Sequence, residues 1–192
     1  MPIKQGQFFF AAVPKQKRRL TATKLPANTQ VSPTMAKEIE HKFLLINDDW
    51  RKSVQKTLVY KQGYLSSQPT CSIRVRLSDD QAWLNIKSAT IGTERLEFEY
   101  EIPVKDADEI LNVLCNKPLI EKRRHLVSFE NHLWEIDEFD GDNKGLIVAE
   151  IELSEIGEIF GKPPWLGQEV TYDLRYYNNN LAIYPFNKWH KK

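Results

Sequence analysis

Hydrophobic and polar residues alternate along most of the chain after residue 35. The segment 94–103, Glu-Arg-Leu-Glu-Phe-Glu-Tyr-Glu-Ile-Pro, shows this pattern, with a charged residue at every second position from Arg95 onward. Because successive side chains of a strand point to opposite faces, a period of two predicts strands with one polar and one apolar face. Eight strands are predicted in this way, at 37–46, 57–65, 70–78, 81–88, 94–103, 120–128, 131–139 and 145–154.

The links between these strands indicate how they pack. Several links are only a few turn residues long, so neighbouring strands are predicted to pair antiparallel. Helices are predicted at 106–115, with Asp106 as N-cap, at about 171–182, with Thr171 as N-cap, and around 48–56. Eight strands with so few helices predict a mainly β (α+β) fold: a closed eight-stranded antiparallel β-barrel with a few peripheral helices.

The first 34 residues differ in composition from the remainder of the chain. They contain four prolines and six basic residues, no Asp or Glu, and no sustained periodicity. This composition predicts a disordered basic leader at 1–34, followed by a single domain at 35–192. Met35 begins the regular pattern, so either an upstream start codon or an organelle transit peptide would explain the leader.

Composition and charge exclude several classes of function. Without the leader, the chain has 21 basic and 26 acidic residues, a net charge of −5, whereas a nucleic-acid-binding domain is usually basic. No apolar run approaches the roughly 18 residues of a membrane span, and the two cysteines, Cys71 and Cys115, lack the spacing of metal ligands. We therefore expect a cytoplasmic protein in a reducing compartment, with no nucleic-acid or membrane partner.

Charges on the predicted strands are sorted by sign. Acidic residues are paired at i and i+2 on four strands, and basic residues are paired in the same way on two. A solvated outer face, the usual alternative, mixes polar residue types and scatters its signs. The sorting therefore favours charged faces that converge on the barrel interior, with the apolar faces buried outside. The paired residues are Glu38 and Glu40, Glu97 and Glu99, Glu135 and Asp137, Glu150 and Glu152, Arg74 and Arg76, and Lys122 and Arg124.

Such an interior fits a ligand that carries both signs of charge. Desolvating a charge costs several kcal/mol, and mutual pairing often fails to recover that energy. A polyphosphate with divalent cations would balance the charges, since Arg and Lys bind phosphate oxygens and carboxylates bind Mg²⁺ or Mn²⁺. We therefore expect a small-molecule polyphosphate as the partner and metal-dependent phosphoryl transfer to water as the reaction.

The order of these motifs resembles one known family. Glu38-Ile39-Glu40-His41-Lys42 matches the Glu-x-Glu-x-Lys signature of the CYTH superfamily, the triphosphate tunnel metalloenzymes. The resemblance covers 36–188 and points to the bacterial inorganic triphosphatase branch. The other motifs that follow in the family's order are Arg74-x-Arg76, Lys87, Arg95-x-Glu97-x-Glu99, Lys122-x-Arg124, Trp134-Glu135-Ile136-Asp137, Glu150-x-Glu152 and Asp173-Leu174-Arg175-Tyr176-Tyr177-Asn178.

The resemblance implies a triphosphate tunnel and assigns roles to its residues. Glu38 or Glu40 would activate the attacking water, and Arg175 would either reach the tunnel mouth or remain an exposed helix arginine. The metal ligands implied by the family are Glu38, Glu40, Glu99, Asp137, Glu150 and Glu152. The phosphate-binding residues implied by the family are Lys42, Arg74, Arg76, Lys87, Lys122, Arg124 and Arg175.

The activity implied by the resemblance is hydrolysis of inorganic triphosphate to diphosphate and phosphate with Mg²⁺ or Mn²⁺. A class IV adenylyl cyclase and a thiamine- or nucleoside-triphosphatase would use the same barrel. The cyclase branch has a His-Phe pair ahead of its Glu-x-Glu-x-Lys, and this chain has none ahead of Glu38. A non-catalytic polyphosphate-binding module is the third hypothesis, but such a module would be free to lose its metal ligands. The sequence leaves open a monomer or a homodimer.

Overall fold

The computed structural model describes residues 36–67, 70–88 and 93–189. The predicted leader at 1–34, with the two hypotheses about its origin, lies outside these residues. Within them the chain forms nine strands, two α-helices and four short 3-10 helices. None of the described helices has the length and hydrophobicity needed to cross a membrane.

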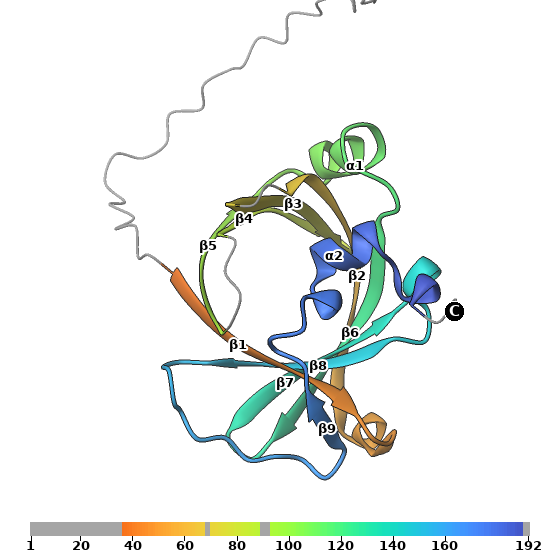
Figure 1. Cartoon of the computed structure of the whole chain (residues 1–192). Coiled ribbons are helices and arrows are strands. Elements are labelled where there is room, and N and C mark those ends of the chain that lie inside the picture. Colours follow the sequence, from red (N-terminus) through yellow and green to blue (C-terminus); the bar gives the residue numbers. More distant parts are fainter. Residues whose placement is uncertain (1–35, 68–69, 89–92, 190–192) are drawn as a thin grey trace, which may run out of the picture. The chain divides into compact units, whose positions relative to one another are not determined.

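Eight of the strands close into an antiparallel barrel (Figure 1). They follow the order β5-β4-β3-β2-β6-β7-β8-β1, and β5 pairs again with β1 to complete the ring. The short strand β9 extends the sheet beside the end of β1. The strands are β1 Ala36–Leu45, β2 Val54–Ser67, β3 Cys71–Ser78, β4 Gln81–Ser88, β5 Glu94–Glu101, β6 Ile120–Phe129, β7 His132–Phe139, β8 Ile147–Leu153 and β9 Leu166–Glu169.

This topology confirms the closed eight-stranded antiparallel barrel predicted from the period-two pattern. The bounds of the eight barrel strands agree with the prediction to within three residues. The strand β9 was not predicted, because four residues are too few to establish an alternating pattern.

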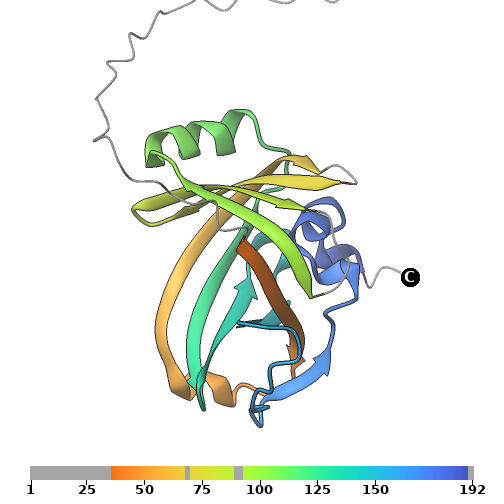
Figure 2. The same cartoon turned by 90° about the vertical axis from the view of Figure 1, so that its left-hand side faces the viewer.

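Helix α1 (Val104–Val113) covers part of the outer face of the barrel. It lies across the outside of β3 and β4 (Figure 2), where Leu111 packs in one cluster with Val75 and Ala82. Leu111, Val75 and Ala82 are all fully buried. The apolar faces of these strands are thus buried between the sheet and a helix, outside the ring.

A second apolar cluster covers the outside of β1, β7 and β8. Trp134 of β7 is fully buried there, and its ring meets Phe160 and Trp165 edge-on at centroid distances of 5.8 and 5.4 Å. Both of these rings come from the connection between β8 and β9, and Trp50 of the 3-10 turn η1 (Asp49–Ser53) joins the same cluster. The hydrophobic core therefore surrounds the barrel, as the sorted charges predicted.

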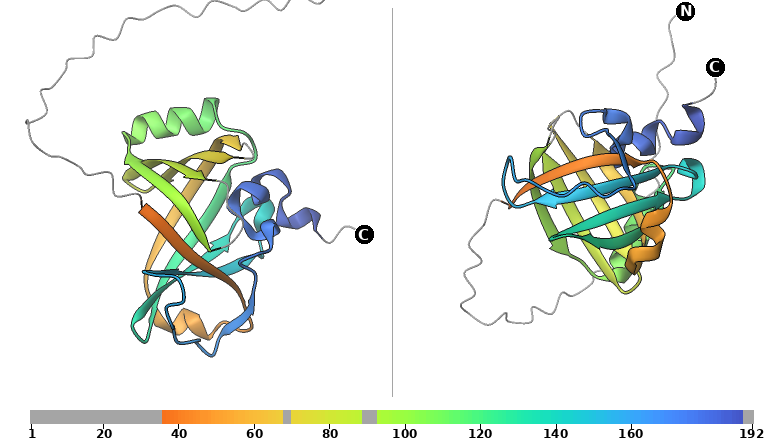
Figure 3. Two further views of the ribbon diagram at one scale, coloured as in Figure 1. Left: turned by 60° about the vertical axis from the view of Figure 1, so that its left-hand side comes forward. Right: turned by 90° about the horizontal axis from the view of Figure 1, so that it is seen from below.

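One end of the barrel is closed by apolar side chains. Helix α2 (Asn178–Ile183) lies at this end in every view (Figure 3) and buries Leu181 completely. Leu181 packs against Ile120, Phe139 and Val148, which point inward from β6, β7 and β8. The polar part of the interior therefore begins beyond this apolar end.

The C-terminal region differs from the helix predicted at 171–182. Its residues form the 3-10 turn η3 (Leu174–Tyr176) and the short helix α2. Thr171 is not a helix cap, because its Oγ1 accepts a hydrogen bond from the backbone N–H of Lys42 at 3.0 Å. The prediction of one helix was wrong here because the Thr171 side chain bonds to β1 and is not available to cap a helix.

The other two predicted helices are shifted or shortened. Helix α1 follows Pro103 and starts two residues before the predicted start, so Asp106 lies in its first turn and not at its cap. Proline is well suited to a helix start, since its missing N–H loses no hydrogen bond there. The helix predicted around 48–56 is only the 3-10 turn η1.

The outer position of the core yields a test of stability. Leu111→Ala should lower the free energy of unfolding by about 2–5 kcal/mol, because it leaves a cavity between α1 and the sheet. Val113→Ala is the matched control in the same helix, since Val113 is 72% exposed and its truncation should change the free energy by less than about 0.5 kcal/mol. Denaturant unfolding monitored by circular dichroism measures both; equal effects would contradict the covering role of α1.

Candidate active site

The strand register directs one polar face of each barrel strand to the interior. Side chains of directly opposed residues lie on the same face of a sheet. Glu38 on β1 is opposed by a residue of β5, that strand by residues of β4, and so on through every strand back to β1. All residues connected in this way lie on one face of the sheet. The charged residues on this shared face are Glu38, Glu40, Lys42, Lys56, Arg74, Arg76, Lys87, Arg95, Glu97, Glu99, Glu101, Lys122, Arg124, Glu135, Asp137, Glu150 and Glu152, of which Lys56 is exposed.

The first acidic pair is held by bases from two neighbouring strands. The Glu38 carboxylate accepts hydrogen bonds from Lys87 Nζ at 2.8 Å and from Arg95 Nε at 2.6 Å. Arg95 Nη2 also donates to Glu40 at 2.6 Å, and Lys42 Nζ lies 2.9 Å from the same carboxylate. Arg95 therefore bridges the two carboxylates of the Glu-x-Glu motif.

The two carboxylates of this motif differ in acidity. Burial alone would raise the pKa of Glu38, but Lys87 and Arg95 more than offset it and hold the pKa far below its ordinary value. Burial and the nearby Glu150 carboxylate instead raise the pKa of Glu40. Glu40 is therefore the stronger base of the two.

A second network joins the strands β6, β7, β8 and β1. Arg124 donates to Asp137 from Nε and Nη2, both at 2.7 Å, and to Glu150 from Nη2 at 2.6 Å. Lys122 pairs with Asp137, and Lys42 pairs with Glu150. Burial opposes ionisation of Glu150, but Lys42 and Arg124 hold its pKa well below the ordinary value. Lys42 and Arg124 therefore stabilise the ionised form of Glu150.

Burial and neighbouring positive charges lower the pKa values of three interior basic residues. Burial and the neighbouring Arg74 lower the pKa of Arg76, while burial, Arg95 and Arg74 lower the pKa of Lys87. Burial and the Arg124 guanidinium lower the pKa of Lys122 to about 8. An anion bound among these residues would relieve their repulsion.

Arg76 is oriented by aromatic rings. Its guanidinium lies 5.1 Å from the ring centre of Tyr60 and 4.9 Å from that of Trp83, and its Nη2 donates to Glu99 at 2.8 Å. Guanidinium groups stack favourably on aromatic faces. Its Nε has no hydrogen-bond partner among the described residues.

The acidic residues offer oxygen donors suited to a hard divalent cation. Glu152 lies directly opposite Glu40, and no basic side chain pairs with it among the described residues. Burial and the negative charges of Glu38 and Glu135 raise the pKa of Glu152. Carboxylates that raise one another's pKa gain from a bound cation, so this donor set fits Mg²⁺ or Mn²⁺. Within the described residues, however, no three Asp, Glu, His or Cys side chains are grouped closely enough to hold a metal ion.

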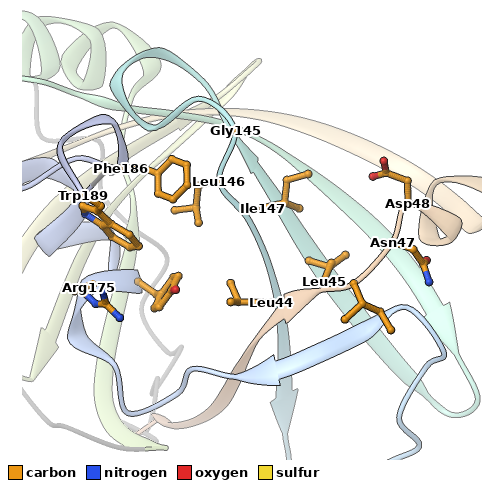
Figure 4. Close-up of a pocket in the computed structure, with 12 residues that line it drawn as sticks. Leu44, Leu45, Asn47, Asp48, Gly145, Leu146, Ile147, Arg175, Phe186 and Trp189 are labelled. Atoms are coloured by element: carbon orange, nitrogen blue, oxygen red, sulfur yellow. The ribbon is translucent and has the colours of Figure 1, made fainter. Parts of the chain in front are cut away.

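Arg175 is the one predicted site residue that the structure does not bring to the interior face. It lies in η3, 60% exposed at its side chain, and its Nη2 pairs with Asp173 at 2.6 Å. Figure 4 shows it beside Trp189 at the edge of a pocket that Leu44 and Phe186 also line. The side chain of Arg175 is thus exposed, and its role at the tunnel mouth stays a prediction.

The interior face also contains residues that the family motifs do not assign. Arg95, Glu97 and Glu135 were in the motifs but had received no role, although the register places them among the assigned residues. Asn85 and Gln62 were missed entirely. Asn85 is two residues before Lys87 on β4, and Gln62 lies opposite Arg76. The period of two on these strands was the signal that could have found them.

Comparisons with known proteins agree with this arrangement. Residues 36–182 match the model of the CYTH domain family. An inorganic triphosphatase of Acetivibrio thermocellus is 48% identical over 155 residues, which are 81% of this chain and 99% of that protein. An inorganic triphosphatase of Nitrosomonas europaea is 36% identical over 151 residues, 76% of this chain and 97% of that protein.

Solved structures are similar in fold. The crystal structure of the inorganic triphosphatase NE1496 superposes with a TM-score of 0.57 at 28% identity, covering 78% of this chain and 96% of that one. The match therefore includes nearly the whole of that protein. With the family match and the two sequence relatives, it shows that this chain belongs to the CYTH domain family.

Proposed function

We propose that this protein is a metal-dependent inorganic triphosphatase that hydrolyses tripolyphosphate to diphosphate and phosphate inside its barrel. The observation that carries the proposal is the convergence of many carboxylates and basic side chains from the barrel strands on one interior face. The two curated relatives, both inorganic triphosphatases that align over almost their full length, support the same activity.

The basic residues would bind the phosphate oxygens. Arg74, Arg76, Lys87 and Lys122 are largely buried, and the pKa values of the last three are lowered by burial and by neighbouring positive charges. Charge-assisted hydrogen bonds from such groups are strong, and guanidinium matches the geometry of phosphate. Lys42 and Arg124 would complete the set when a phosphate replaces part of their carboxylate partners.

The carboxylates would hold Mg²⁺ or Mn²⁺. Glu38, Glu40, Glu150 and Glu152 are the proposed ligands, with Asp137 and Glu99 as further donors. When bound, such an ion neutralises charge on the phosphate oxygens and polarises the attacking water.

The reaction needs a base and a charged environment for the leaving group. The water oxygen forms a bond to a terminal phosphorus, the bond from that phosphorus to the bridging oxygen breaks, and diphosphate leaves with the bonding electrons. Glu40 is the proposed acceptor of the water proton, since its pKa is raised whereas that of Glu38 is lowered. The surrounding Arg and Lys side chains stabilise the charge that develops on diphosphate.

Replacing the proposed base tests its role. Glu40→Gln should lower kcat for phosphate release from tripolyphosphate by about 10²–10⁴-fold, because the amide cannot accept the proton. Glu121→Gln removes the same charge from an exposed outward position of β6 and should leave kcat unchanged. Both are measured at saturating Mg²⁺ and again with Mn²⁺; a Glu40→Gln enzyme within threefold of wild type would exclude Glu40 as the base.

Removing a basic residue of the interior tests the phosphate site. Arg74→Ala should raise KM for tripolyphosphate by about 10- to 100-fold, the effect of one lost charge-assisted hydrogen bond. Arg123→Ala is the control, since Arg123 is exposed on the outer face of β6. An unchanged KM in steady-state phosphate release by Arg74→Ala would remove Arg74 from the binding set.

The lowered pKa of Lys122 predicts a pH dependence of binding. Below about pH 8 the amine is already charged. Above it, a bound phosphate must draw a proton onto the amine, so affinity falls as the pH rises. Lys122→Arg keeps its charge throughout this range.

Titration calorimetry without metal measures the dissociation constant of tripolyphosphate for each protein. The effect is the dissociation constant of wild type divided by that of Lys122→Arg. The ratio should rise by up to about tenfold per pH unit above about pH 8. Both proteins bind the same ligand, so the ratio cancels the pH dependence that comes from protonation of tripolyphosphate itself. A ratio independent of pH would show that this amine does not titrate with the substrate.

A further inference from the structure

Gln62 lies within β2 and is fully buried, yet its carboxamide is unpaired. Neither Nε2 nor Oε1 has a hydrogen-bond partner among the described residues. Such a group destabilises the folded chain, because it has lost its bonds to water and gained none. Most buried polar groups in proteins are paired, so an unpaired carboxamide at this position calls for a functional reason.

The register places the Gln62 side chain in the barrel interior. Its directly opposed residues are Arg76 on β3 and Ile120 on β6, both on the inward face. The adjacent Gly63 faces outward, where an added Cβ would lie 2.7 Å from the Cβ of Cys115. Opposed residues have Cβ atoms about 4.5–5.5 Å apart, so the carboxamide is close to the Arg76 side chain.

Gln62 is one of four residues with unpaired buried groups on adjacent inner faces of β2, β3 and β4. The others are Arg74 and Arg76, at Nε, and Asn85, at Oδ1. Arg74 lies opposite Asn85 in the same way that Gln62 lies opposite Arg76. Across the barrel, in contrast, Glu38, Glu40 and Glu150 are each paired with bases. On the inner face of the barrel strands, the unused hydrogen-bonding capacity of the described residues therefore lies beside the proposed phosphate-binding arginines.

The chemistry of these groups matches a phosphate. Its non-bridging oxygens accept hydrogen bonds, so they satisfy the Nε–H groups of both arginines and the Nε2–H of Gln62. The Oε1 atom needs a donor, which a protonated phosphate oxygen or a water bound to the phosphate supplies. A neutral amide also adds a donor without adding charge, where Arg74 and Arg76 already repel each other.

We propose that Gln62 contacts the substrate: its Nε2 donates to a non-bridging phosphate oxygen beside Arg74 and Arg76, and its Oε1 accepts from a P–OH group or water carried by that phosphate. The inference rests on the proposed triphosphatase function and adds a neutral residue to the charged set. Gln62 is a binding residue, so its loss should change KM and the dissociation constant more than kcat.

Gln62→Met tests this with a side chain of similar size and no hydrogen bonds. The melting temperature of the unliganded protein should stay the same or rise, since an unpaired buried amide is removed. The dissociation constant for tripolyphosphate without metal, and KM with Mg²⁺, should rise by about three- to tenfold, the effect of one hydrogen bond. Gln55→Met, at an exposed position of the same strand, should change neither binding constant.

Gln62→Glu provides a second test that does not depend on the methionine variant folding. Its carboxylate would pair with the unpaired Nε atoms of Arg74 and Arg76, so the melting temperature should rise. The same carboxylate would repel and replace the phosphate, so tripolyphosphate should bind more weakly than to Gln62→Met. A residue with only a structural role would not give stability and affinity that move in opposite directions.

The outcomes separate the two proposals. Wild-type protein that neither binds nor hydrolyses tripolyphosphate would overturn the triphosphatase function, and the role of Gln62 with it. Wild-type protein that binds and hydrolyses it, with both Gln62 variants equal to wild type in dissociation constant and KM, would overturn the role of Gln62 alone. Weaker binding explained entirely by lost stability would also overturn that role.

Discussion

The pairing of β5 with β1 is the constraint on which the rest of the structure depends. It turns an eight-stranded sheet into a ring, so that one face of every strand points toward a common interior. In an open sheet the same charged side chains would face water on a broad surface. Closure brings the acids of β1 into reach of the bases of β4 and β5. Lys87 donates to Glu38, and Arg95 links Glu38 to Glu40 directly across this seam.

Charge inside the barrel requires hydrophobic burial outside it. Buried ion pairs rarely recover the full cost of desolvation, so the interior networks contribute little to net stability. Burial of Trp134 and Leu111 in two apolar clusters outside the ring, and of Leu181 in a third cluster at one end of the barrel, supplies the opposing term. The division between outer core and inner charge explains how the chain holds so many charged side chains in the barrel interior.

Much of this organisation could be predicted from the sequence. The period of two located all eight barrel strands, and its phase placed the residues of the family motifs on one face. The predictions that were wrong, the helix at 171–182 and the cap role of Thr171, depended on a contact between distant parts of the chain. Arg175 was left as an alternative for the same reason, and in the structure its exposed side chain pairs with Asp173.

The residues that share a face of a strand can be read from the chain, because side chains at successive positions alternate in direction. The strands that became neighbours, and therefore the charges that met, depended on pairing between distant segments. Glu38 and Glu40 are equivalent in the motif, but Lys87 and Arg95 lower the pKa of one while Glu150 raises that of the other. The alternation of residues along β2 likewise could not predict that Gln62 lacks a hydrogen-bond partner. Its possible partners are side chains of other strands, which only strand pairing brings close.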